Sequence, residues 1–93
     1  MAICMIVQFA GMKADKYEAV NHELDFWKNG PPEGNLSHTA GGNADGWYVV
    51  DVWESQGHWD RFLTDRLKPA FDKIGGIPQP RITRFDVHNR MPV

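Results

Sequence analysis

The chain has 93 residues, of which 42% are hydrophobic and 24% are charged, and its formal net charge is −2. A chain of this length forms one domain, here residues 1–93, with a modest core that dimerisation would naturally extend. Charges of both signs are spread without a run, which excludes the basic face of a nucleic-acid-binding protein and a patch for anionic membranes.

The first ten residues are mostly apolar, but they carry no basic leader or cleavage site and are too few to span a bilayer. Cys4 is the only cysteine, so it can form no internal disulfide, and we interpret it as a small buried hydrophobe in a strand. We therefore expect a cytoplasmic protein without a membrane partner. The four histidines lack zinc-type spacing and there is one cysteine, so we expect no metal site. We also expect no cofactor.

The first half of the chain predicts a strand followed by a helix. Residues 2–10 alternate as a strand whose odd positions are bulky, so we expect Met5 and Val7 to pack on helices. Apolar residues then recur at three- and four-residue steps, which predicts a helix that ends at the Gly-Pro-Pro segment 30–32. The apolar stripe of this helix consists of Ala14, Tyr17, Val20, Leu24 and Trp27.

The middle of the chain predicts a hairpin, with strands over 36–40 and 47–54 and a loop over 41–46. Large apolar groups lie on both sides of the second of these strands, so we expect both of its faces to be buried. If Ala40 lies opposite Trp47, then His38 and Asp51 share one surface of the sheet. A slip of one residue in the pairing would separate them.

The last third predicts a second helix and a fourth strand. Ser55 is a good N-cap for a helix whose apolar stripe runs from Trp59 to Ile74. Pro69 lies within this stripe, so we expect a kink or break near Lys68. The fourth strand is predicted over 81–88.

This element order is typical of an α+β, ferredoxin-like βαββαβ domain, with a four-stranded antiparallel sheet and both helices on one face. The other face of the sheet is bare in a monomer, and an apolar patch of that size indicates an interaction site. We expect a second copy of the chain to cover it as a homodimer, and any ligand to lie between the sheet layers.

The size of the alternating side chains along each strand is used to assign them to the two faces of the sheet. The helix-packed side is assigned Met5, Val7, Tyr48, Val50, Val52, Phe85 and Val87. The open face is assigned Gln8, Trp47, Val49, Asp51, Trp53, Arg84, Asp86 and His88, with His38 joining them if the hairpin pairing above is right.

Aromatic walls with a few convergent polar groups suit a pocket for a hydrophobic or aromatic small molecule. We take His38 as the candidate general base and Asp51 as the catalytic partner that fixes its ring tautomer. The candidate ligand-binding residues are Gln8, Trp47, Trp53, Arg84 and His88. The competing interpretation is structural: Asp51, Arg84 and Asp86 form an ion-pair network at a dimer interface, His38 caps the hairpin, and the tryptophans are interface core.

The segment Gly46-Trp-Tyr-Val-Val-Asp-Val-Trp-Glu-Ser55, followed by Trp59 and Phe62, resembles the third strand and second helix of dimeric α+β barrel proteins. This superfamily includes the antibiotic biosynthesis monooxygenase-like and stress-responsive barrel families. The resemblance implies the fold and a homodimer more than an activity, because the superfamily mixes cofactor-free oxygenases, haem-degrading enzymes, isomerases, decarboxylases and proteins of unknown role.

Two departures from the family pattern reduce the range of activities that the resemblance implies. Phe62 stands where many monooxygenase-like members carry a histidine. Gln8, Phe62 and Asp72 lie nearest to the Asn, Trp and His positions of the haem-degrading branch, so the resemblance disfavours haem degradation. What stays open is a cofactor-independent monooxygenase-like or isomerase-like enzyme, or a non-catalytic binding or interaction domain whose open sheet is only a dimer interface. An RNA-recognition sheet ranks last, because the basic, aromatic third-strand pattern is absent.

Overall fold

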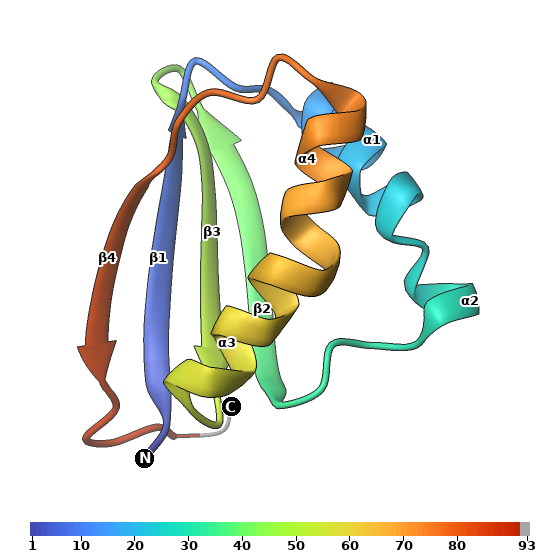
Figure 1. The fold of residues 1–93 in the computed structure, drawn as a ribbon. Helices are drawn as coiled ribbons and strands as arrows, with labels where there is room; N and C mark the ends of the chain where they lie inside the picture. The colour runs from blue at the N-terminus through green and yellow to red at the C-terminus, as the bar shows by residue number, and fades with distance from the viewer. Residues whose placement is uncertain (92–93) are drawn as a thin grey trace.

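The computed structural model describes residues 1–91, and its four strands form one antiparallel sheet in the order β2-β3-β1-β4. The strands are β1 (Ile3–Ala10), β2 (Asn35–Asn43), β3 (Gly46–Trp53) and β4 (Arg81–Asp86). The helical elements are α1 (Ala14–Leu24), α2 (Phe26–Asn29), α3 (Gln56–Phe62), η1 (Leu63–Leu67) and α4 (Lys68–Ile74). All of the helices lie on one side of the sheet (Figure 1). The predicted α+β, ferredoxin-like arrangement is therefore confirmed. No helix in residues 1–91 is long and apolar enough to cross a membrane.

The core lies between the sheet and the helices. Ile3 and Trp53 are each only 1% exposed, and Trp59 of α3 packs against Trp53 with ring centroids 5.7 Å apart. The odd residues of β1 are buried, as their bulk predicts, because they face the helices. Burial of such large apolar groups supplies most of the driving force that holds helices to the sheet.

The strand pairing corrects the predicted faces of β3 and β4. Residues paired directly across antiparallel strands point to the same side of a sheet. Met5 faces the helices and pairs with Asp51 on one side and Arg84 on the other, so these residues share the helix-covered face. The odd residues of β3, including Trp47, Val49 and Trp53, were placed on the open face, which is wrong. Tyr48, Val50, Val52 and Phe85 were placed against the helices, which is also wrong, because they pair with Gln8, Ile6 and Cys4 on the open side.

The first helical segment is interrupted at Asp25, which adopts a left-handed backbone (φ 48°). Asp25 closes α1 and also caps α2, because its carboxylate accepts a hydrogen bond from the Lys28 backbone N–H at 3.2 Å. The break rotates the following residues, so Trp27 is 100% exposed. The prediction that Trp27 continues the apolar stripe is therefore wrong.

The β2–β3 hairpin is tighter than predicted. Pairing continues to Asn43 opposite Gly46, which leaves a two-residue turn at 44–45. Gly46 has φ 150°, and a Cβ there would lie 2.3 Å from the Phe9 carbonyl oxygen, so this close strand approach requires glycine.

The second helical run begins where the sequence predicts and becomes irregular just before Pro69. The Ser55 side chain accepts a hydrogen bond from the His58 backbone N–H at 3.3 Å, which confirms Ser55 as the N-cap. The run then widens into the π-helical turn η1 immediately before Pro69, which lies in the first turn of α4. Proline has no N–H for the preceding turn, which explains an irregularity at this point.

Candidate functional site

The structure brings His38 and Asp51 together as direct partners across the β2–β3 hairpin. Alternate residues of a strand share a face, and Ala40 pairs with Val49 rather than with Trp47, so the pairing differs from the expected one by an even step. A shift of two residues leaves each side chain on the same face of the sheet. The prediction that His38 and Asp51 share a surface is confirmed, but this surface is the one covered by helices.

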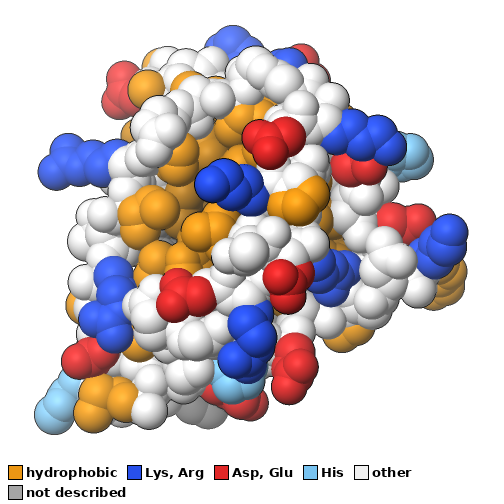
Figure 2. All heavy atoms as spheres, viewed as in Figure 1, with side chains coloured by type: hydrophobic (Ala, Val, Ile, Leu, Met, Phe, Trp, Pro, Cys, Tyr) orange, Lys and Arg blue, Asp and Glu red, His pale blue; other side chains and the backbone are white. Residues whose placement is uncertain are grey.

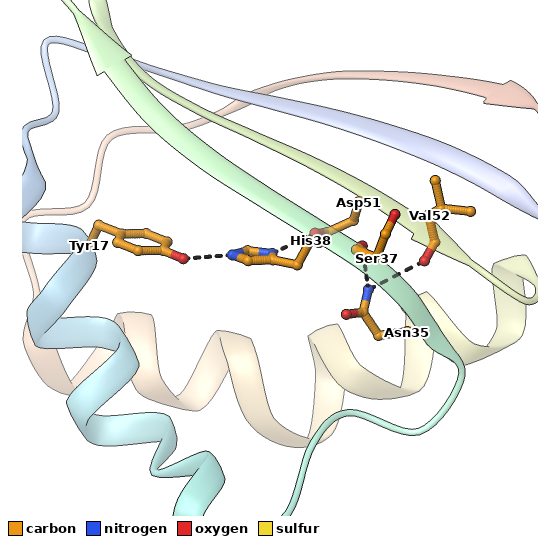
Figure 3. A network of polar contacts seen from close by, with 6 residues as sticks. All are labelled: Tyr17, Asn35, Ser37, His38, Asp51 and Val52. Carbon is orange, nitrogen blue, oxygen red and sulfur yellow. Dashed lines mark hydrogen bonds and ion pairs between the residues drawn. The ribbon is translucent and has the colours of Figure 1, made fainter. Parts of the chain in front are cut away.

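Asp51 is 5% exposed, and its Oδ1 lies 2.5 Å from His38 Nδ1 (Figure 3). The carboxylate accepts a hydrogen bond from Nδ1–H, which leaves the Nε2 lone pair of the neutral ring as an acceptor. The hydrogen bond to Asp51 raises the pKa of His38, burial opposes this rise, and the negative charge of Asp51 adds to it. Asp51 therefore stabilises the imidazolium that forms when His38 takes up a proton.

Tyr17 completes a row of three polar side chains. It projects from α1 toward the sheet, and its hydroxyl lies 2.6 Å from His38 Nε2 (Figure 3). Trp47 packs on the Tyr17 ring with centroids 5.1 Å apart and so holds it in place. Sequence reasoning placed Tyr17 in the apolar stripe and missed this contact. The available signal was its polar hydroxyl on a stripe that faces the sheet, since a buried tyrosine usually finds a partner.

A cavity of about 280 Å³ lies between the covered face of the sheet and the helices. Figure 2 shows hydrophobic side chains gathered in a recess between the sheet and the helices. His38, Asp51 and Tyr17 line one part of the cavity, with Asn21 and Asn35 nearby in its wall. The rest is apolar and is lined by Val7, Phe9, Met12, Val20, Leu24, Phe26, Pro31, Pro32, Val49, Trp53, Trp59, Phe62, Leu63, Leu67, Phe71, Pro80 and Ile82. The cavity is formed within one chain. The expectation that a ligand lies between the sheet layers stays a prediction.

The two predicted tryptophans lie on the covered face. Trp53 lines the cavity, whereas Trp47 lies beside Tyr17 and lines a second hollow near the start of α1. Among the residues that the structure describes, the indole N–H groups of Trp47 and Trp53 are the buried side-chain polar groups without a hydrogen-bond partner. An unpaired buried donor costs free energy, so both indole N–H groups are an energetic cost to this core.

The other predicted ligand-binding residues do not line the cavity. Gln8 lies on the open face of the sheet, and His88 lies beyond the end of β4, where it is exposed. Arg84 is at the β4 edge, where it donates to the Gln56 side chain at 2.6 Å and to Asp86 at 3.0 Å. Ligand contact at these three residues stays a prediction.

The remaining reactive groups of the described chain offer little chemistry. Burial raises the pKa of the Cys4 thiol and the Asp51 carboxylate raises it further, so the thiol stays protonated at neutral pH. Cys4 is 6% exposed, which confirms its interpretation as a buried hydrophobe. Within residues 1–91, His, Cys, Asp and Glu side chains nowhere gather in threes as a metal site. The row Asp51–His38–Tyr17 lines the cavity and contains a group that can accept a proton.

No protein-family model and no curated protein sequence matches this chain. Several solved structures do match it over nearly its whole length. SnoaB, a cofactor-independent oxygenase from Streptomyces nogalater, is 18% identical with a TM-score of 0.67, and the match covers 99% of this chain and 98% of that one. Rv0793 from Mycobacterium tuberculosis is 15% identical with a TM-score of 0.68, over 99% and 100% of the two chains.

A monooxygenase from the gene ActVA-Orf6 of Streptomyces coelicolor, solved in complex with the ligand nanaomycin D, is 19% identical with a TM-score of 0.58. That match covers 99% of this chain and 91% of the monooxygenase. The chain therefore shares the α+β fold of these oxygenase structures, and this fold agrees with the one that the Gly46–Ser55 resemblance predicts. At these identities the likeness establishes the fold alone.

Proposed function

We propose that this protein is a homodimeric α+β barrel that binds a hydrophobic or aromatic small molecule in the cavity and removes a proton from it without a cofactor. The observation that carries the proposal is a carboxylate-backed imidazole, His38 on Asp51, at the polar part of an otherwise apolar cavity. Apolar walls hold such a ligand, and a few placed polar groups orient it.

The chemistry follows from the His38–Asp51 pair. The neutral imidazole accepts a proton at Nε2 while Asp51 keeps its hydrogen bond to Nδ1–H and balances the new positive charge. The ligand retains the electron pair as an enolate or phenolate. Return of the proton at another carbon gives an isomerase-like reaction, whereas reaction of the anion with dioxygen gives a monooxygenase-like reaction.

The cavity also favours a particular ligand chemistry. The rings of Trp53, Trp59 and Phe62 line the cavity and pack against one another with centroids 5.3 to 6.4 Å apart, which offers aromatic surface to an aromatic ligand. Support by analogy comes from the same fold in a cofactor-independent oxygenase and in a monooxygenase that holds nanaomycin D.

The open face of the sheet supports the homodimer. Val50 is 38% exposed and Phe85 is 48% exposed on this face, with Ile6 between them on β1. A second copy would cover these apolar side chains and close the barrel. The same observation favours the second candidate function, a non-catalytic binding or interaction domain. In that reading His38 and Asp51 are a structural pair that stabilises the hairpin.

Hydrogen exchange of an enolisable aromatic ketone separates the two candidates. We would measure by NMR the exchange of the acidic C–H protons of 2-tetralone in D₂O with the wild-type protein. We expect exchange faster than in buffer and at least about tenfold slower with His38→Gln, because the variant lacks the base. His22→Gln, at an exposed position on α1, is the matched control and should leave the rate unchanged.

Equal exchange rates for the wild-type protein and His38→Gln would contradict the enzymatic proposal. Binding of 2-naphthol, seen as a raised melting temperature, without accelerated exchange of 2-tetralone would favour the non-catalytic candidate.

A further inference from the structure

We infer that Tyr17 is a catalytic residue that carries the proton between the ligand and His38, so that the imidazole acts through the tyrosine hydroxyl. The inference rests on the proposed function, because it concerns how the same base is reached. Its evidence is the contact of 2.6 Å between the Tyr17 hydroxyl and His38 Nε2.

The hydrogen-bond directions follow from Asp51. Its carboxylate can only accept, so the proton between it and His38 belongs to Nδ1. The neutral ring then has its one lone pair at Nε2, and the Tyr17 O–H donates to that lone pair. The acceptor site of the base is therefore occupied by Tyr17.

The ring geometry places the hydroxyl along the direction of this lone pair. The planes of Tyr17 and His38 are 8° apart and their centroids are 6.1 Å apart. Together with the hydroxyl contact to Nε2, this separation sets the rings end to end in nearly one plane, as Figure 3 shows. The Nε2 lone pair lies in the imidazole plane, so the hydrogen bond is well aligned for proton transfer.

Tyr17 lines the same cavity as His38 and occupies the acceptor atom of the base. It lines the cavity from α1 while Trp47 packs on its ring, so it cannot swing away freely. A ligand proton that approached Nε2 directly would have to displace the Tyr17 hydroxyl. The phenolic oxygen keeps lone pairs that can accept a proton from a ligand in the cavity.

The step balances as a concerted double transfer. The ligand C–H or O–H bond breaks and its proton bonds to the Tyr17 oxygen, while the Tyr17 O–H bond breaks and that proton bonds to His38 Nε2. The electron pair of the broken ligand bond stays on the ligand as an enolate or phenolate. Tyr17 ends as a neutral phenol, and the imidazolium is held by Asp51, so neither an oxidant nor a reductant is needed for this step.

The test compares Tyr17→Phe with His38→Gln in the exchange of 2-tetralone protons. Tyr48→Phe is the matched control, because Tyr48 is the other tyrosine of the chain and lies on the open face of the sheet. We expect Tyr17→Phe to lower the saturated exchange rate at least about tenfold, as His38→Gln does, because both variants break the same chain of transfers. The half-saturating ketone concentration should change less than about threefold, since the apolar walls remain.

The outcomes separate the inference from the proposed function. If Tyr17→Phe keeps the wild-type exchange rate, or exceeds it because Nε2 is freed, while His38→Gln loses it, then His38 acts directly and the relay is wrong. If both variants keep the wild-type rate, or the wild-type protein does not accelerate exchange, then the proposed function itself fails. A tenfold loss with Tyr17→Phe accompanied by an equal loss with Tyr48→Phe, or by a lower melting temperature, would assign Tyr17 a structural role instead.

Discussion

The two faces of the sheet differ in what they carry. The helix-covered face holds the buried Asp51 with its partner His38, an apolar cavity, and an unpaired indole N–H of Trp53. The open face presents apolar side chains such as Val50 and Phe85, which are 38% and 48% exposed. Apolar exposure suits contact with another protein surface, whereas a buried charge with a hydrogen-bonded partner suits chemistry on a small ligand.

The proposed function assigns the ligand to the covered face and the second subunit to the open face. Strand β3 belongs to both regions, because its odd residues face the helices and its even residues face outward. A substitution on this strand should therefore affect either the core and cavity or the subunit contact, according to the parity of its position.

Truncating Trp53 should have the largest effect on stability. The side chain is 1% exposed and packs against Trp59 and Phe62, so Trp53→Ala should lower the free energy of unfolding by about 3 to 5 kcal/mol. The neighbouring open-face variant Val50→Ala should cost about 1 kcal/mol or less in the monomer. Urea unfolding at low protein concentration measures the free energy of unfolding of both variants. Similar losses would contradict the placement of Trp53 on the covered face and Val50 on the open face.

Placing a charge on the open face should dissociate the dimer. Phe85→Glu would bury an unpaired carboxylate between subunits and weaken association by about 100-fold or more. Ile82→Glu is the matched control on the same strand, because Ile82 is similarly exposed at 45% but points to the covered face and lines the cavity.

Sedimentation velocity should then show a monomer for Phe85→Glu and a dimer with weakened 2-naphthol binding for Ile82→Glu. Dissociation by both variants, or by neither, would mean that the two faces of β4 do not differ as described.

The His38–Asp51 pair should make stability depend on pH. The hydrogen bond to Asp51 raises the pKa of His38 in the folded state above its ordinary value of 6.5. The stabilisation is therefore complete below about pH 6.5 and is lost as the pH rises through the folded-state pKa. The difference in unfolding free energy between the wild-type protein and His38→Gln should be larger near pH 5.5 than near pH 8.5. His22→Gln serves as the control. A difference in unfolding free energy that grows with pH would contradict a raised His38 pKa in the folded state.

Removing Trp27 should have the smallest effect. This side chain is 100% exposed on α2 and is not among the residues that line the cavity. Trp27→Ala should change the free energy of unfolding by less than about 0.5 kcal/mol, as surface substitutions usually do. A loss above about 1 kcal/mol in thermal or urea unfolding would show that α2 packs more closely than described.

Local patterns of apolar spacing predicted the elements of the fold, because the period of a strand or helix is a property of neighbouring residues. The faces of β3 and β4 could not be predicted in this way. Both sides of β3 carry large apolar groups, and only its pairing with Met5 fixes which side Asp51 joins. Trp27 was misplaced because the left-handed Asp25 interrupts a helix whose spacing alone looks continuous.

The candidate site was predictable only in part. Alternation along β2 and β3 predicted that His38 and Asp51 share a face, since an even shift in pairing leaves the face unchanged. The contribution of Tyr17 depends on how α1 rests on the sheet, which is a matter of tertiary packing rather than of spacing. The cavity likewise depends on the gap left between helices and sheet.

The most direct test of the division between faces is the position of a bound aromatic probe. Nuclear Overhauser contacts between 2-naphthol and the isotopically labelled protein would report the residues beside the ligand. We predict contacts from the naphthol protons to Tyr17 and Trp53, which line the cavity on the covered face. Contacts confined to Val50 and Phe85 would place the ligand on the open sheet and contradict the account.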